Sequence, residues 1–210
     1  MNFHKTHANY PPIHETKPIT INDLVVINKK FMGGGMSQSY SAIYIIEHYI
    51  HLHKFNYVVE IGSQKGALST YLANNASISE QFIFETYDIQ TKDWFCREYE
   101  GCGHWFHKLE TISPYIKFFK LDIFSEEAMT HIKENIGLYK TLIICDGGNK
   151  AKEFNTYHKF LKKDDRIIVH DWPAEINMRN ISLDNTIQVD NPWDQYCQSL
   201  GSLLMPFRKV

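Results

Sequence analysis

Short apolar runs alternate along most of the chain with segments of helical periodicity. The apolar runs have the length of buried strands and cover 57–61, 82–89, 116–123, 141–146 and 166–171. The intervening segments that repeat apolar residues every three or four positions cover 67–76, 125–136 and 152–161. Near-continuous apolar strands separated by helices pair in parallel through right-handed crossovers. The pattern predicts an α/β fold: a doubly wound, mostly parallel Rossmann-like sheet with helices on both faces.

The two ends of the chain depart from this alternation. Residues 1–35 contain three prolines and close on three consecutive glycines, which predicts an N-terminal arm and a glycine-rich hinge before one domain over 36–210. A helix is expected to follow Ser37 as its N-cap. Gly137 is expected to end the helix that Ser125 begins. The tail can supply one or two closing strands, whereas 191–201 has no clear assignment.

Acidic residues stand at or near the ends of the predicted strands, namely Glu60, Asp88, Asp122, Asp146 and Asp171. Ligands of doubly wound sheets bind in the crevice at the carboxyl ends of the strands. Aspartate is also common in turns after strands, so any single member says little. The set of five predicts one crevice ringed by carboxylates.

The sequence EIGSQKG follows the first predicted strand and opens a helix. Gly62 permits a sharp turn and Gly66 a close approach of the helix, so a ligand can lie against bare amides. Gln64 replaces the second glycine of the dinucleotide-binding motif, which disfavours an NAD-dependent oxidoreductase. Asp88 lies 22 residues beyond Gly66, where a carboxylate can accept both hydroxyls of a ribose. Asp122 ends the third predicted strand, near the expected place of an adenine edge.

Composition excludes several classes of partner. A formal net charge of -2 and a pI near 6.6 argue against a nucleic-acid binder. The chain contains no apolar run of about 18 residues and no apolar signal segment at its start, so we expect a cytoplasmic protein without membrane contact. The 4 cysteines are too few for a disulfide scaffold. The expected partner is a small-molecule acceptor, and a homodimer is a further expectation.

The order EIGSQKG, YDI, KLDIF, IICDGG and FLKKDDRIIVHDW resembles the class I S-adenosylmethionine-dependent methyltransferases, over roughly 57–172. The resemblance implies S-adenosylmethionine as cofactor, with the glycine loop at its methionine moiety, Asp88 at the ribose and Asp122 at the adenine. The cofactor-binding residues that it implies are Glu60, Gly62, Ser63, Gly66, Asp88, Asp122 and Asp146. Gln64 and Lys65 depart from the family, which often has a further glycine there.

Within that family, DGGNKAKEF followed by a strand ending in HDW is most similar to small-molecule O-methyltransferases of the cephalosporin hydroxylase, rhamnosyl and macrocin type. Those relatives often hold Mg²⁺ between acids after the fourth and fifth strands, which implies Asp146 and Asp171 as ligands. Two carboxylates suit Mg²⁺ on chemical grounds as well. Trp172 stands where many metal-dependent relatives have a third acid or amide, and Glu175 is the candidate substitute.

These features predict methyl transfer to a hydroxyl of a sugar or natural product, with Mg²⁺ assisting. Lys150 or His170 is expected to take the proton if its pKa lies near neutrality. Their ordinary alternatives are a solvated lysine at a helix start and an internally bonded strand histidine. A different class of function is a binding protein that keeps the fold without catalysis. The segment Cys96 to His107 lacks zinc-site spacing, and its aromatic residues are candidates to cover the crevice.

Overall fold

The computed structural model describes residues 40–64, 66–79, 82–89, 110 and 114–210. The expected N-terminal arm and hinge, the Ser37 cap and the segment Cys96 to His107 lie outside the described residues. In the described part of the chain, no helix combines the length and the apolar character needed to cross a membrane.

Seven strands of the described chain form one sheet in the order β3-β2-β1-β4-β5-β7-β6. The parallel strands are β1 (Tyr57–Ile61), β2 (Ile83–Asp88), β3 (Ile116–Lys120), β4 (Thr141–Cys145) and β5 (Arg166–Val169). The tail adds β6 (Ile187–Val189) and β7 (Met205–Lys209), and β7 runs antiparallel to both of its neighbours. The predicted doubly wound, mostly parallel sheet is confirmed.

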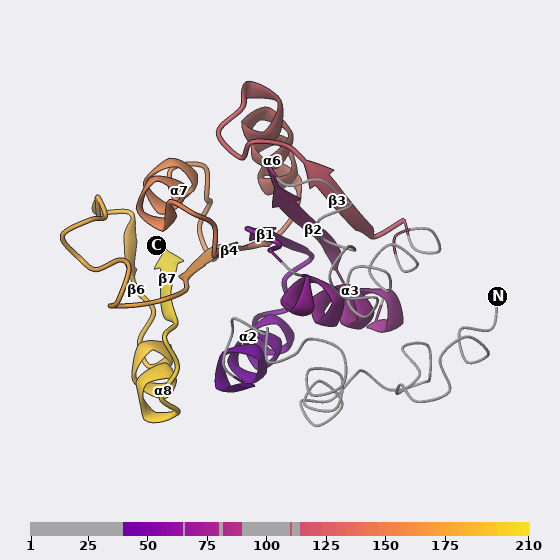
Figure 1. Ribbon diagram of the computed structural model, residues 1–210. Coiled ribbons are helices and arrows are strands. Elements are labelled where there is room, and N and C mark those ends of the chain that lie inside the picture. The colour runs from indigo at the N-terminus through magenta and orange to yellow at the C-terminus, as the bar shows by residue number, and fades with distance from the viewer. Residues whose placement is uncertain (1–39, 65, 80–81, 90–109, 111–113) are drawn as a thin grey trace.

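Helices cover both faces of this sheet (Figure 1). One face carries α2 (Tyr40–His53), α3 (Ala67–Ser79) and α8 (Trp193–Ser199), and the other carries α6 (Glu126–Leu138) and α7 (Lys150–Tyr157). Alternate residues of each strand enter the two cores, because successive side chains of a strand point to opposite faces. In β1, Val58 packs with the first group of helices and Val59 with the second.

The centre of the sheet aligns three strand ends at one edge. Ile61, the last residue of β1, lies opposite Tyr87 of β2 and Cys145 of β4. The chain order reverses between β1 and β4, so the loops that follow these two strands diverge toward opposite faces. Such a switch point is where open α/β sheets leave a crevice for a ligand.

The structure corrects the predicted end of one helix, confirms its predicted start, and assigns the segment 191–201. Gly137 does not end a helix, because α6 continues through it to Leu138 and the Tyr139 amide donates to the Asn135 carbonyl. Ser125 is the predicted N-cap, and its hydroxyl accepts from the Ala128 amide at 3.2 Å. The unassigned segment 191–201 contains α8, which packs beside α2 through Trp193.

Candidate active site

A cleft of about 890 Å³ opens at the carboxyl ends of the parallel strands. The loops that follow β1 to β5 all contribute to its wall. Four of the five predicted acids line it, namely Asp88, Asp122, Asp146 and Asp171. The topology therefore brings together carboxylates that are as much as 83 positions apart in the sequence (171 minus 88).

Gly62 turns the chain at the end of β1 with a φ of 92°, a conformation that favours glycine. A Cβ at this position would lie 2.6 Å from the Asp146 carbonyl oxygen and 2.6 Å from the Gly147 Cα. The Asp146 amide donates to the Ile61 carbonyl at 3.0 Å beside this contact. The glycine loop after β1 thus packs directly on the loop after β4.

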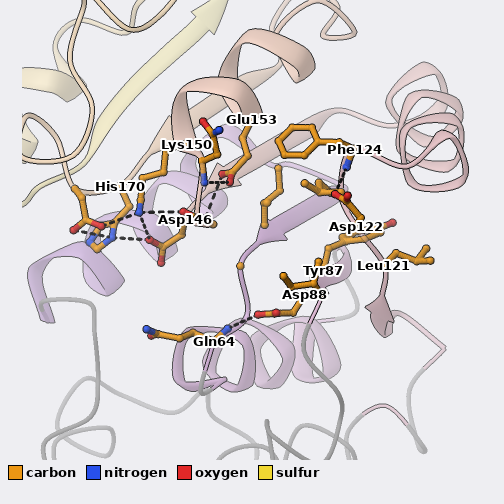
Figure 2. A pocket seen from close by; sticks show the side chains of 18 of the residues that line it. Gln64, Tyr87, Asp88, Leu121, Asp122, Phe124, Asp146, Lys150, Glu153 and His170 are labelled. Carbon is orange, nitrogen blue, oxygen red and sulfur yellow. Dashed lines mark hydrogen bonds and ion pairs between the residues drawn. The ribbon is translucent and has the colours of Figure 1, made fainter.

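Gln64 adopts the backbone conformation of a glycine although it is not one. Its φ is 45°, in the left-handed region, and its amide donates to Asp88 Oδ2 at 2.9 Å. The carboxylate at the end of β2 therefore holds the turn after β1 (Figure 2). A left-handed turn therefore follows β1 although the residue at this position is not a glycine.

Glu60 and Ser63 lie beneath the glycine loop rather than on the cleft wall. Glu60 is 1% exposed, and its Oε2 accepts from the hydroxyls of Ser69 and Thr86, the latter at 2.7 Å. The Ser63 hydroxyl lies 2.5 Å from that of Thr86, and the Ser63 carbonyl accepts from the Gly66 amide at 2.8 Å. In this structure these residues support the loop, and their contact with a cofactor stays a prediction.

Burial of Glu60 has an electrostatic consequence. Removal from water raises the pKa of its carboxyl to about 8, although the hydrogen bonds from Ser69 and Thr86 act in the opposite direction. The charges of Asp146 and Asp88 add to the increase. Glu60 therefore holds a proton more tightly in the folded protein than a carboxyl group in water does.

One end of the cleft is formed by Tyr87, Asp88 and Asp122 (Figure 2). Asp122 follows β3 by two residues and is exposed, and its Oδ1 accepts from the Phe124 amide at 2.9 Å. The Tyr87 ring stacks on Phe119 at 4.8 Å between centroids with an interplanar angle of 11°. Sequence reasoning missed Tyr87 as a wall residue, because it reads there as one more apolar strand position.

Five residues at the opposite end form what we call the acidic corner: Asp146, Lys150, His170, Asp171 and Glu175. Lys150 Nζ lies 3.0 Å from Asp171 Oδ2 and 2.8 Å from Glu175 Oε2, and 3.9 Å from Asp146 Oδ1. His170 Nδ1 lies 2.8 Å from Asp146 Oδ1 and 3.4 Å from Asp171 Oδ1. The predicted catalytic and metal residues thus meet in one place (Figure 2).

The carboxylates of the acidic corner raise the pKa of both basic residues in it, Lys150 and His170. Burial opposes protonation of Lys150, but the hydrogen bonds with Glu175 and Asp171 outweigh it and raise the lysine pKa above its usual range. Burial likewise opposes protonation of His170, and the hydrogen bond and charge of Asp146 raise its pKa above 6.5. Lys150 is therefore a cation at neutral pH, and His170 binds a proton more tightly than an imidazole in water does.

Glu153 of α7 is a wall residue that sequence reasoning did not single out. Its carboxylate accepts from the Gly147 amide at 3.2 Å and from the Asn149 amide at 3.1 Å. A Cβ on Gly147 would lie 2.3 Å from Glu153 Oε1, so the glycine makes room for this carboxylate. Asn149 is the N-cap of α7, and a glutamate shortly after an N-cap is the signal that could have found the contact.

The donor set at the acidic corner fits a divalent cation. Asp146, His170 and Asp171 each offer one ligand atom, and these atoms lie within 4.8 Å of one another. Carboxylate oxygens suit Mg²⁺ and Mn²⁺, and an added imidazole nitrogen suits transition metals such as Fe²⁺ or Zn²⁺. Glu175, the sequence candidate for a third ligand, contacts Lys150 in this structure.

No protein-family model matches the sequence, and no curated protein matches it. Solved structures do resemble the fold. CmcI without ligand superposes with a TM-score of 0.61 at 12% identity, over 83% of this chain and 73% of that one. CmcI with magnesium and S-adenosylmethionine gives a TM-score of 0.55 at 12% identity over the same shares.

An O-methyltransferase from Bacillus cereus, in complex with S-adenosylhomocysteine, gives a TM-score of 0.55 at 13% identity and covers 92% of both chains. Identities this low establish the shared fold and carry no residue roles. The chain has the fold of S-adenosylmethionine-dependent O-methyltransferases.

Proposed function

We propose that the protein transfers the methyl group of S-adenosylmethionine to a hydroxyl of a small molecule, in the class of sugars and polyhydroxylated natural products. The observation that supports this best is the division of one cleft into two ends. One end offers Asp88 and Asp122, whose carboxylates can accept hydrogen bonds from the ribose and the amino group of an adenosine. The other offers a carboxylate-bound histidine, as a hydroxyl acceptor requires.

The cofactor follows from the first end. Asp88 accepts the ribose hydroxyls, and Asp122 receives the adenine edge. Gly62 lines the cleft between Asp88 and Asp146, so the methionine part extends from the ribose past the glycine loop toward the acidic corner. The sulfonium methyl then faces the acceptor. Structural neighbours solved with S-adenosylmethionine or S-adenosylhomocysteine support this choice of cofactor.

We assign the removal of the acceptor proton to His170 rather than to Lys150. The hydrogen bond from Nδ1 to Asp146 orients the imidazole, which leaves Nε2 to accept the proton of the acceptor hydroxyl. The acceptor oxygen forms a bond to the methyl carbon, the carbon–sulfur bond breaks, and S-adenosylhomocysteine leaves as a neutral thioether. Lys150, a cation, instead holds Asp171 and Glu175 in position.

Asp146 and Asp171 are the residues that would hold Mg²⁺ in this corner. A bound Mg²⁺ would lower the pKa of the acceptor hydroxyl and fix its oxygen in line with the methyl group. The convergence of ligand atoms supports the assignment, as does a neighbour of the same fold that was solved with magnesium and S-adenosylmethionine.

Transfer of a labelled methyl group from S-adenosylmethionine to a panel of sugars, polyols and phenols tests the reaction. We expect label in a hydroxyl-bearing acceptor and one S-adenosylhomocysteine for each methyl transferred. A protein that binds S-adenosylhomocysteine firmly but transfers no label to any member of the panel would favour the binding-protein alternative over catalysis.

A further inference from the structure

The ammonium group of Lys150 is surrounded by oxygen atoms from two loops. Besides its three carboxylate neighbours, Nζ donates to the Gly147 carbonyl at 3.2 Å. The side chain is only 8% exposed, although lysine is rarely buried without partners. Its head group thus has the surroundings that an inorganic cation would find among the same acids.

We propose that Lys150 is the resident cation of the acidic corner and that a divalent ion binds there only by displacing its ammonium group from Asp171. This inference rests on the metal site of the proposed function. The Asp171 carboxylate is both a candidate ligand of the metal and the ion-pair partner of Lys150, whose Nζ lies 3.0 Å from Oδ2. Two cations held by one carboxylate lie close enough to repel each other strongly.

Glu175 gives the displaced ammonium group a place to go. Its Oε2 already accepts from Lys150 Nζ at 2.8 Å, and its side chain is 64% exposed. The lysine stem has four rotatable methylenes, so the head group can leave Asp171 and keep Glu175 as its partner. Glu175 is therefore a positioning residue that acts on the metal through Lys150, rather than a metal ligand.

Calorimetric titration of the full chain with MnCl₂ tests the competition. We expect Lys150→Met to bind Mn²⁺ about tenfold or more tightly than the unmodified protein, because the competing cation is gone. Lys159→Met removes the same charge from an exposed position and should leave Mn²⁺ affinity unchanged. Equal or weaker binding by Lys150→Met, or no binding by either protein, would overturn the proposal.

A double-mutant cycle with Glu175→Gln separates the two roles of Glu175. If Glu175 acts through Lys150, the substitution lowers Mn²⁺ affinity several-fold in the unmodified protein and has no effect in Lys150→Met. An equal loss in both backgrounds would make Glu175 a direct ligand and refute the displacement. Circular dichroism of each variant verifies that it is folded.

The same samples distinguish this inference from the proposed function. Titration with S-adenosylhomocysteine in EDTA measures the cofactor site without any metal. Failure of the unmodified protein to bind S-adenosylhomocysteine would contradict the methyltransferase proposal, whereas an unchanged Mn²⁺ affinity on removal of Lys150 would contradict only the competition.

Discussion

Gly62 lies directly against the carbonyl group of Asp146, with room for a hydrogen but not for a methyl group between them. The contact joins the loop after β1, which we assign to the cofactor, to the loop after β4, which carries the acidic corner. Asp146 in turn holds His170 through its carboxylate. A change at Gly62 should therefore reach both ends of the cleft.

Gly62→Ala should lower the free energy of unfolding by about 2 to 4 kcal/mol, because the new Cβ meets backbone atoms at 2.6 Å and the φ of 92° is strained for alanine. Urea denaturation measures the loss. Gly148→Ala is the matched control, since a Cβ there has no heavy atom within 4 Å. Equal stability of the two variants would show that the loops are not packed as described.

Gly137→Ala should stabilise the protein by about 0.5 to 1 kcal/mol, because this exposed glycine lies inside α6 with open space around it. Chemical denaturation of the variant and the unmodified protein provides the measurement. A loss of stability would mean that the helix ends at Gly137 after all, as the sequence pattern suggested.

The prediction from sequence succeeded where one local signal was sufficient. Apolar runs identified the five parallel strands, and their terminal acids, such as Asp88 and Asp171, do meet in one cleft. Gly137 misled because a glycine near a helix end marks a stop only when the backbone turns left-handed there.

The remaining misses concern the direction of two side chains, Glu60 across a long sequence separation and Glu153 across a short one. Glu60 turns under its loop because Ser69 and Thr86 offer hydroxyls there, and Thr86 belongs to another strand. Glu153 reaches back to the amides of the preceding loop. For Glu60, no periodicity or strand-end rule carries such information, because the contact depends on how separate elements pack against each other; for Glu153, the N-cap at Asn149 is the available signal.

Glu60 should make stability fall as the pH rises. Its folded-state pKa of about 8 lies above the ordinary value of 4.5, so the folded protein binds the proton more tightly than the unfolded chain. The contribution of Glu60 is complete below pH 4.5 and is lost progressively as the pH rises through 8. Glu60→Gln should remove this part of the dependence.

The measurement is the difference in unfolding free energy between Glu60→Gln and the unmodified protein, followed from pH 5 to pH 9. The difference should move by a few kcal/mol in favour of the variant toward high pH. Subtraction cancels other titrating groups, including Glu153, whose pKa burial raises to about 7. A difference that is constant with pH would show that Glu60 is ionised in the folded state.

His170→Asn should reduce the rate of methyl transfer by about 10²-fold to 10⁴-fold, because asparagine cannot accept the proton. In the unmodified protein the rate should fall on the acidic side of a pKa above 6.5, where His170 is protonated. The variant should lose this limb of the pH–rate profile. An acidic limb that survives the substitution would assign the base to another group.

Removal of divalent metal should slow methyl transfer, and added Mg²⁺ should restore it. Asp146→Asn should abolish the restoration, because it removes a ligand charge and weakens the contact that orients His170. The measurement compares rates in EDTA and in MgCl₂ for both proteins. Full activity in EDTA would show that the acidic corner works without a metal.

Binding of S-adenosylhomocysteine is the most direct test of the cofactor assignment on which the account depends. Isothermal titration calorimetry should show saturable binding of S-adenosylhomocysteine and none of NAD. Asp88→Asn should weaken that binding about tenfold to a hundredfold, because a charged acceptor for the ribose hydroxyls is lost while an amide oxygen can still receive the Gln64 amide. Glu134→Gln, on the exposed face of α6, should have no effect. No binding of S-adenosylhomocysteine, or equal binding by Asp88→Asn, would contradict the account.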